Sequence, residues 1–586
     1  MTMPGKSPPA RDRARDLLRS LARTLTGADL AEIAVYIVLS LAAALMGSLA
    51  ALLLVPLVQP GAPLTIAGGM FEVHGSVEKQ AAYFAAATVS VAVLRWLAAR
   101  LAARLTSRYS MTRRQLVHAR LIDAPLTSLA DRTSAEIANV LTYNVEIITQ
   151  AYSALLQLLV AGVTTVVSLV FALWLSPPLV LAVPLIAGFA LVASRAFGRE
   201  QSQVSRQYIA DLTRLFWLSE DFPRRLRHVR SFEREDAEKH SFGTISARLG
   251  QGYRRQLELI ASGKLMLELM AAVGIAVVLV LAYRWHGVDQ SSLIAVCLLL
   301  GRLLPYLVST RQNFQQLRSA APASELWRKY MHLESARSFD ASPRATVSRH
   351  ALRIDRMRVR PPDAGLDLGD LALTPGELTL ISGDSGIGKS SLVDVLAGMM
   401  RPEWFAARVG DQPVDFDEYR ELVRHGAYVS QSVRPWQHSV RECLLWAAPD
   451  ATDDMLWSAL ADVGLDKRLA KSADGLETAL HSSSSRLSGG ELQRLLLAQV
   501  ILRQPFLALL DEATSALDAA AEMAVLAAIK SRLRQTILIV VSHRSGVAAM
   551  ADQCVVIGND LVTTVHGKSD VPPREASFGA SNRSTS

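Results

Sequence analysis

Apolar runs and polar connections alternate over the first 310 residues of the chain. The first run extends over 33–57 without a charged side chain, which is enough for a helix to cross a hydrocarbon core of about 30 Å. Five further runs also have the apolar composition of a membrane-spanning helix. The six predicted spans are 33–57, 81–99, 151–175, 179–194, 265–283 and 293–307.

The connections between the predicted spans differ in length and charge. Segments 105–150 and 196–264 are long and rich in arginine, whereas 58–80 has Lys79 as its only lysine or arginine. Positively charged connections tend to stay on the cytoplasmic side of a membrane. The pattern therefore predicts a membrane domain over 31–330, with both long loops and both chain termini in the cytoplasm.

Residues 1–30 are polar and basic, with leucines at helical spacing among the arginines. This pattern is typical of an interfacial helix, here on the cytoplasmic surface. A cleaved signal peptide does not fit, because the basic region is long and the apolar run after it is too long for a signal core.

Each long loop is amphipathic and helix-compatible on both sides of a proline, at Pro125 and at Pro223. We expect each loop to form two helical extensions of the neighbouring spans, joined by a short crossing segment. Such extensions would carry a movement of the membrane domain to a cytoplasmic partner.

Charged residues interrupt the predicted spans or their edges at three places: Arg95, the pair Lys264 and Glu268, and Arg302. A charge in the middle of a bilayer costs about 2.5–3.5 kcal/mol on insertion scales, so each should face a cavity, a partner or the interface. Lys264 and Glu268 are four residues apart and can pair on one helical face. Arg302, next to Gly301, is the best candidate for lining a cavity.

Composition supports a membrane protein. Half of the residues are hydrophobic and 20% are charged. The net charge of +8 would suit a nucleic-acid partner, but most of the basic excess lies in loops beside apolar spans, which indicates membrane topology and no nucleic acid. Cys297, Cys443 and Cys554 are far apart, so they predict neither a disulfide framework nor a metal cluster.

The second half of the chain has a different pattern. After a polar linker at 331–350, strand-like and helical runs alternate over 351–567, which is typical of an α/β domain, and a polar tail follows at 568–586.

A phosphate-binding loop is predicted early in this domain. An apolar strand at 378–381 leads into Gly383-Asp384-Ser385-Gly386-Ile387-Gly388-Lys389-Ser390, and a helix follows at 391–399. The octapeptide fits GxxxxGK[ST], in which backbone N–H groups and the lysine bind nucleotide phosphates and the final hydroxyl ligates Mg²⁺.

Acidic and histidine side chains follow two later apolar strands. Asp511 and Glu512 end the strand at 506–510, where the first carboxylate suits Mg²⁺ and the second suits polarising a water for attack on a γ-phosphate. His543 follows the strand at 536–541 and can donate a hydrogen bond to the same phosphate. Singly, such residues are more often structural, but their joint order favours an ATP site.

Two further elements fit that order. Gln431 follows a short strand at 427–430, and its amide can reach a metal or the attacking water. Arg486-Leu487-Ser488-Gly489-Gly490-Glu491 precedes a helical run at 492–502, so a second helix start presents N–H groups to an anion.

The order of phosphate loop, glutamine, LSGG, DE, SALD and SH resembles the ATP-binding cassette (ABC) family, and the six preceding spans resemble an exporter-type half-transporter of that family. The resemblance covers about residues 30–567. It implies an all-α six-helix membrane domain followed by an α/β P-loop cassette. Two cassettes of this family sandwich two ATP molecules, so a chain with one cassette implies a dimer. We expect a homodimer, with a heterodimer as the alternative.

The resemblance also assigns roles to residues, with ATP and Mg²⁺ as cofactors. Lys389, Glu512 and His543 would be catalytic, with Glu512 as the base. Mg²⁺ would be held by Ser390, Gln431 and Asp511. Nucleotide binding would use Gly383, Asp384, Ser385, Gly386, Ile387, Gly388, Lys389, Ser390, Ser391 and Gln431, with Ser488, Gly489 and Gly490 capping the ATP of the partner subunit.

Three segments resemble the parts that couple membrane domain and cassette in such exporters. Residues 126–145 and 220–235 are similar to the family's two intracellular loops, and 436–444 is similar to the cassette segment that receives them.

The chain departs from the family pattern at three places. Pro361 stands where such exporters usually have an aromatic residue that stacks on adenine, so Arg358 or Arg360 would stack instead. Residues 481–485 replace a GExG element that touches the loops, and Glu491 replaces the usual glutamine.

From these features we expect ATP-driven export of a hydrophobic or amphipathic compound from the cytoplasm by alternating access. A mature peptide is the favoured cargo, and a lipid or a drug is an alternative. A leader-cleaving peptide exporter is disfavoured, because residues 1–30 are too short for a peptidase domain. A lipid flippase and an ATP-binding membrane regulator that does not transport are the competing hypotheses. Arginine- and alanine-rich usage with a single cassette suggests a bacterial inner membrane.

Overall fold

The computed structural model describes residues 27–58, 77–129, 132–175, 200, 203–216, 218–219, 222–284, 290–333, 351–359, 365–384, 386–480, 487–558 and 563–567. The chain divides into two compact units. The first comprises Met1–Ala124 and Ala130–Glu334, and the second comprises Pro125–Leu129 and Ser335–Ser586. Most of the predicted interfacial helix, the predicted span at 179–194 and the tail at 568–586 lie outside the described residues.

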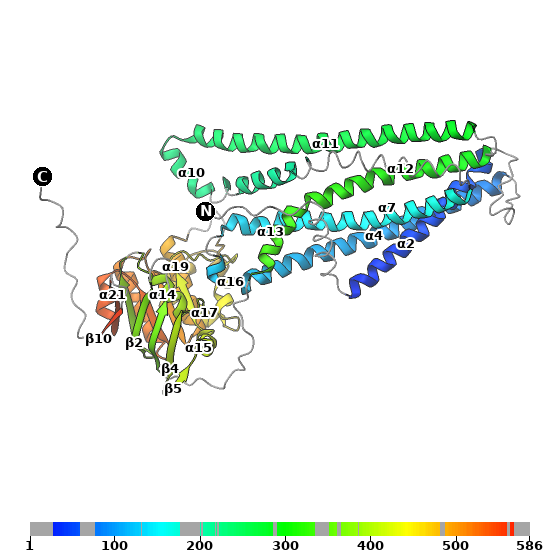
Figure 1. The fold of residues 1–586 in the computed structure, drawn as a ribbon. Coiled ribbons are helices and arrows are strands. Elements are labelled where there is room, and N and C mark those ends of the chain that lie inside the picture. Colours follow the sequence, from blue (N-terminus) through cyan, green and yellow to red (C-terminus); the bar gives the residue numbers. More distant parts are fainter. Residues whose placement is uncertain are drawn as a thin grey trace. The chain divides into compact units, whose positions relative to one another are not determined.

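Helices build the described part of the first unit, and several of them are long (Figure 1). In chain order they are α2 (Gly27–Leu53), α3 (Val55–Val58), α4 (Val77–Asp123), α6 (Ser134–Asn139), η1 (Val140–Asn144), α7 (Val145–Leu175), α10 (Phe222–Ser231), α11 (Glu235–Arg284), α12 (Gln290–Ser319) and α13 (Ala321–Met331). The π-helical stretch η1 joins α6 to α7 without a break, so these three elements form one continuous helix.

Three of these helices are long and apolar enough to cross a membrane, as far as the described residues go: α2, α4 and the helix formed by α6, η1 and α7. They contain the first three predicted spans. The predicted spans at 265–283 and 293–307 lie within α11 and α12. The count of six spans stays a prediction, because 179–194 is outside the described residues.

The helices α2, α4, α7 and α12 run side by side (Figure 1). Their shared core contains the stacked rings of Tyr109 and Tyr152, whose centroids are 4.3 Å apart. Val38, Val89 and Val166 face outward and are 61–63% exposed. Apolar outer faces of this kind suit lipid as the surrounding solvent.

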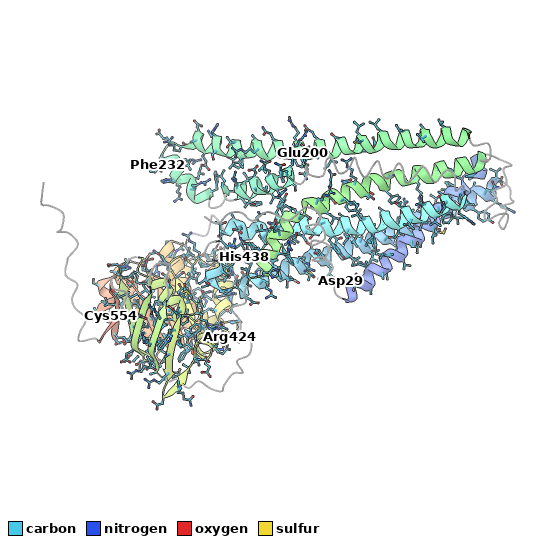
Figure 2. All side chains as sticks on the ribbon, in the orientation of Figure 1. Asp29, Glu200, Phe232, Arg424, His438 and Cys554 are labelled. Atoms are coloured by element: carbon cyan, nitrogen blue, oxygen red, sulfur yellow. The ribbon has the colours of Figure 1, made fainter. Side chains whose placement is uncertain are left out.

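Ion pairs connect the start of α2 to the polar second half of α4. Asp29 lies in the first turn of α2 (Figure 2), and the Arg108 guanidinium of α4 is 3.7 Å from its carboxylate. The same guanidinium is 2.9 Å from the carboxylate of Glu32.

In their described residues, both long loops have the predicted helical form. In the first, α4 continues to Asp123, the short helix α5 (Leu126–Leu129) follows Pro125, and Thr133 caps α6 by accepting a hydrogen bond from the Glu136 N–H. In the second, α10 leads into α11, and Phe232 lies at the turn between them (Figure 2).

Two sheets form the centre of the second unit. A four-stranded antiparallel sheet has the order β2-β1-β4-β5, and a six-stranded sheet has the order β10-β9-β3-β8-β7-β6. The strands are β1 (Leu352–Val359), β2 (Leu366–Leu373), β3 (Leu378–Gly383), β4 (Trp404–Val409), β5 (Gln412–Val414), β6 (Ala427–Ser430), β7 (Leu507–Asp511), β8 (Ile537–Val541), β9 (Gln553–Ile557) and β10 (Thr563–Gly567).

Helices cover the six-stranded sheet on both faces. They are α14 (Lys389–Leu396), α15 (Phe416–Val423), α16 (Val440–Ala447), α17 (Asp453–Asp462), α18 (Asp466–Ala470), η2 (Gly475–Glu477), α19 (Gly489–Arg503), α20 (Ala519–Arg532) and α21 (Ser545–Met550). One core joins the sheet to α16, α17, α19 and α20, and another joins it to α14, α15 and the smaller sheet. Strand β8 is buried along its whole length, which explains its purely apolar sequence.

The predicted fold class is confirmed, since a helical domain precedes an α/β domain built on a mainly parallel sheet.

Candidate nucleotide-binding site

The predicted phosphate loop joins the end of β3 to the start of α14. Gly386 and Gly388 have φ angles of 80° and 104°, a left-handed conformation that favours glycine over residues with a Cβ atom. Ser385 lies outside the described residues. The backbone of this loop is thus shaped for the turn that the motif requires at a helix N-terminus.

The side chain of Lys389, the first residue of α14, folds back over the phosphate loop. Its Nζ donates hydrogen bonds to the carbonyl oxygens of Gly383, at 2.9 Å, and Asp384, at 2.8 Å. Burial lowers the pKa of the Lys389 ammonium, while Glu512, Asp511 and Asp384 act in the opposite direction. The lysine is therefore held at the loop by neutral carbonyl groups that an incoming phosphate can replace.

The predicted site residues come together because parallel strands end at one edge of the sheet. In the register, Ile381 of β3 is level with Val541 of β8, and Val541 is level with Asp511 of β7. The Gln431 N–H donates to the Asp511 carbonyl at 2.9 Å, and the Gln431 side chain is exposed. Ligands of open α/β sheets bind at this carboxyl edge.

Ser390 and Asp511 offer two oxygen donors side by side. The Ser390 hydroxyl donates to the Asp511 carboxylate at 3.2 Å, and the Tyr428 hydroxyl lies 3.5 Å from the same carboxylate oxygen. Burial raises the pKa of the Asp511 carboxyl, and the hydrogen bond from Ser390 lowers it.

Hard oxygen donors of this kind fit Mg²⁺, which keeps few protein ligands and takes the rest from phosphate and water. Among the described residues, no group of three or more His, Cys, Asp or Glu side chains could hold a metal ion. Ser390 and Asp511 would supply protein oxygens to Mg²⁺ here, with the exposed Gln431 side chain as the third predicted ligand and the bound nucleotide and water supplying the rest.

Glu512 and His543 face each other at the ends of β7 and β8. The His543 Nε2 atom is 3.5 Å from a Glu512 carboxylate oxygen, and both side chains are partly exposed. Glu512 has a φ of 51° and its N–H donates to the Val541 carbonyl at 3.1 Å. The predicted base, Glu512, and the predicted hydrogen-bond donor to a γ-phosphate, His543, thus lie next to each other.

The second predicted anion site is the start of α19. Ser488 caps this helix by accepting from the Glu491 N–H, and the Glu491 carboxylate accepts from the Ser488 N–H at 2.6 Å. A Cβ atom on Gly490 would lie 2.9 Å from the Ala516 carbonyl oxygen, so glycine permits close packing there. The capping role of Glu491 follows the S-x-x-E pattern, a sequence signal that our prediction did not use.

Sequence reasoning also missed a clamp on the segment Ser515–Ala516–Leu517–Asp518. Arg544, next to His543, donates to the carbonyl oxygens of Leu517, at 2.7 Å, and Ser515, at 3.0 Å, and pairs with Glu522 at 3.0 Å. From the other side, the Gln493 side chain of α19 accepts from the Ala516 N–H at 2.9 Å. No sequence motif marks this contact between residues so far apart.

The structure describes only part of the segments at which the sequence differs from the family pattern. Arg360, Pro361 and residues 481–485 lie outside the described residues. The Arg358 guanidinium is 3.6 Å from the Glu403 carboxylate and 3.8 Å from that of Asp367. Adenine recognition by arginine stays a prediction.

Comparison with known proteins identifies both halves of the chain. Residues 31–300 match the family described as ABC transporter transmembrane region, and residues 366–515 match the family described as ABC transporter. These ranges contain, respectively, most of the predicted spans and the motifs from the phosphate loop to Glu512.

Curated relatives align over most of the chain. An ATP-dependent lipid A-core flippase of Ralstonia nicotianae is 25% identical over 82% of this chain and 82% of its own length. Proteins of the same description from Bordetella pertussis and Burkholderia orbicola are each 26% identical, over 73% and 75% of this chain and 69% and 75% of their own lengths.

A solved structure of a bacterial Atm1-family ABC exporter with ATP bound shares the fold. It has a TM-score of 0.75 and 18% identity, and the alignment covers 92% of this chain and 95% of that one. Family matches, fold and site geometry agree. The chain belongs to the ABC transporter family as an exporter-type half-transporter, an integral multi-pass membrane protein whose ATP-binding, ATP-hydrolysing cassette is coupled to translocation.

Proposed function

We propose that two copies of this chain form a homodimer in a bacterial inner membrane and use ATP with Mg²⁺ to export an amphipathic compound from the cytoplasm. The observation that carries the proposal is the convergence of Lys389, Asp511, Glu512 and His543 at one sheet edge, in a chain that also carries the membrane helices. The proposed domains are the membrane domain at 31–330 and the cassette at 351–567.

The phosphate loop, Gly383 to Ser391, would hold the ATP phosphates, with Lys389 moving from the loop carbonyls to phosphate oxygens. Bound Mg²⁺, on Ser390, Asp511 and Gln431, would neutralise charge on the phosphate oxygens. Glu512 would accept the proton of the attacking water while the bond between the β- and γ-phosphates breaks and ADP leaves. His543 would donate a hydrogen bond to the γ-phosphate.

ABC exporters act as dimers. A homodimer of this chain would have two equivalent ATP sites. The start of α19 presents Ser488, Gly489 and Gly490 on a partly exposed surface, available to a second cassette. Since the carboxylates Asp511 and Glu512 and the histidine are all present, both sites of a homodimer would hydrolyse ATP.

The relatives described as lipid A-core flippases favour a lipid over the mature peptide that the sequence suggested. Their identity of 25–26% supports an amphipathic cargo as the class.

The test is translocation in proteoliposomes whose cassettes face outward, with ATP and Mg²⁺ supplied outside and a fluorescent phospholipid in the outer leaflet. We expect transfer to the inner leaflet that stops when Glu512→Gln replaces the parent, because loss of a general base costs roughly 100-fold or more in rate. Retained ATP binding by the variant is the control. ATP turnover without any transfer of phospholipid, peptide or hydrophobic dye would contradict export and favour a regulator.

A further inference from the structure

We propose that Tyr428 is a positioning residue for Mg²⁺ binding and that it acts through the Asp511 carboxylate. The inference rests on the proposed use of ATP with Mg²⁺ and adds a residue to that site. Tyr428 lies in the strand before Gln431 and belongs to none of the motifs that predicted the site.

Tyr428 and Asp511 lie on neighbouring parallel strands and on the same face of the sheet. In the register, Tyr428 of β6 is level with Leu509 of β7, and Asp511 is two residues further along β7. Side chains two residues apart on a strand share a face, and an aromatic side chain is long enough to reach a diagonal neighbour. This register brings the phenol to the carboxylate.

The ring of Tyr428 is held by the core. It packs against the apolar cluster that joins the six-stranded sheet to α14, α15 and the smaller sheet, and the side chain is only partly exposed. Burial raises the pKa of the phenol, and the carboxyls of Asp394 and Asp511 raise it further. The hydroxyl therefore keeps its proton and serves as a hydrogen-bond donor.

Two hydroxyl groups converge on one oxygen of the Asp511 carboxylate. The Tyr428 hydroxyl is 3.5 Å from Oδ2, and the Ser390 hydroxyl donates to the same atom at 3.2 Å. Ser390 belongs to α14 and Tyr428 to β6, so the carboxylate is held from two elements. Two donors on Oδ2 fix the plane of the carboxylate, and with it the direction of Oδ1.

A fixed carboxylate suits the ion that this site is proposed to bind. Mg²⁺ takes few protein ligands and demands nearly ideal octahedral geometry. Groups that hydrogen-bond a metal ligand set its orientation, and the loss of one typically costs about 10–100-fold in metal affinity or activity. Ser390 is itself a predicted ligand, whereas Tyr428 is not. Removing the Tyr428 hydroxyl therefore changes the support of Asp511 without removing a ligand.

The experiment measures ATP binding by the full-length protein in nanodiscs. Glu512→Gln is the reference protein and is present in every variant, so that bound ATP is not consumed. ATP displaces a fluorescent ATP analogue, once with Mg²⁺ and once with EDTA, and the ratio of the two affinities is the gain that Mg²⁺ provides. The test variant is Tyr428→Phe, which keeps the ring in the core and removes only the hydroxyl.

The matched control is Tyr419→Phe. Tyr419 is fully buried in the same apolar cluster, and its hydroxyl donates to the Leu396 carbonyl at the end of α14. This variant also loses one hydroxyl from the core. It therefore reports any general loosening of the domain.

We expect Tyr428→Phe to bind ATP in EDTA as the reference does and to lose about tenfold of the gain from Mg²⁺. Tyr419→Phe should keep the whole gain. In an Asp511→Asn background, Tyr428→Phe should cause no further loss, because the carboxylate through which it acts is gone.

An unchanged gain in Tyr428→Phe, or an equal loss in Tyr419→Phe, would overturn the inference. Weaker ATP binding in EDTA to the same extent as in Mg²⁺ would also overturn it, because the hydroxyl would then support the nucleotide site in general. A reference protein that gains no affinity from Mg²⁺ would overturn the proposed use of Mg²⁺ and this inference with it. A failure of export leaves the test valid, since binding is measured without turnover or cargo.

Discussion

At the scale of the residue, the folded protein disfavours the ionised form of the Asp511 carboxyl. Burial raises the pKa of its carboxyl, and although Ser390 lowers it, Glu512 raises it further. A carboxyl whose pKa is higher in the folded than in the unfolded state lowers the free energy of unfolding when ionised. That loss is recovered as the pH falls through the folded-state pKa, so metal-free protein should gain stability on mild acidification from this group.

Asp511→Asn removes this buried charge and the proposed Mg²⁺ ligand together. We expect the variant to melt about 2–4 °C higher than the parent in EDTA, as a gain of roughly 1 kcal/mol would give. Its Mg²⁺-dependent ATP hydrolysis should fall about 100-fold. Calorimetry and a phosphate-release assay measure the two effects.

Asp394→Asn is the matched control for that experiment. Burial raises the pKa of the Asp394 carboxyl too, with Asp511 as the second cause, but Asp394 is not a proposed ligand. The control should gain stability and keep its hydrolysis. A lower melting temperature for Asp511→Asn would contradict the argument from burial.

Residues in short motifs could be predicted, because the chemistry fixes their spacing in the chain. The motif GxxxxGK[ST] placed Gly386, Gly388 and Lys389 where the structure has them. The bonds of Lys389 to the loop carbonyls, and the left-handed backbone of Glu512, depend on the folded surroundings and have no sequence signature.

At the scale of the element, the clamp around Ser515–Asp518 connects α19 to the turn that carries His543. Glu522 is 2% exposed, and Arg544 is its ionic partner at 3.0 Å. The same guanidinium holds the Ser515 and Leu517 carbonyls, while Gln493 holds Ala516. Arg544 thus has two roles: it stabilises the fold by pairing with the buried Glu522, and it holds the segment Ser515–Asp518 in position.

A double-mutant cycle separates the two parts. Arg544→Met alone should lower stability by about 3 kcal/mol, because it leaves the buried Glu522 carboxylate without its ionic partner, with only the hydrogen bond from the Thr514 hydroxyl. Adding Glu522→Met should restore most of that stability, since an apolar pair can replace a buried ion pair. Turnover should stay about tenfold low in both variants with ATP binding unchanged, because the segment is no longer held in place.

Chemical denaturation and steady-state hydrolysis provide the readouts for this cycle. Full recovery of turnover in the double variant would assign the arginine a purely structural role.

Apolar runs predicted the three described helices that are long and apolar enough to cross a membrane, but not where those helices end. The run at 81–99 lies inside α4, which extends over Val77–Asp123 because its polar second half stays helical and packs Leu105, Tyr109 and Val117 into the core. The pairing of Arg544 with Glu522 could not be predicted, because it joins the residue before α21 to the first turn of α20, and only the fold brings these two places together.

At the scale of the whole molecule, the proposed dimer places Lys389 of one subunit opposite Ser488 of the other. Mixed dimers test this arrangement. Their two subunits carry different affinity tags and different substitutions. Lys389→Ala and Ser488→Arg on different subunits of one dimer leave one site with both residues intact. The same two changes on one subunit, paired with an unchanged subunit, damage both sites.

We therefore expect residual ATP hydrolysis from the first mixed dimer and almost none from the second. Sites formed within single subunits would give the reverse order, because the unchanged subunit would keep a complete site. Tandem affinity purification isolates each mixed dimer, and phosphate release measures its activity.

The left-handed backbone of Glu512 sets a limit on how this protein can be engineered. A non-glycine residue in that conformation costs of order 1 kcal/mol, and glycine would relieve it. Libraries selected only for resistance to heat would therefore drift toward Glu512→Gly and collect inert proteins. Selection for durable variants has to keep a requirement for ATP consumption at every round.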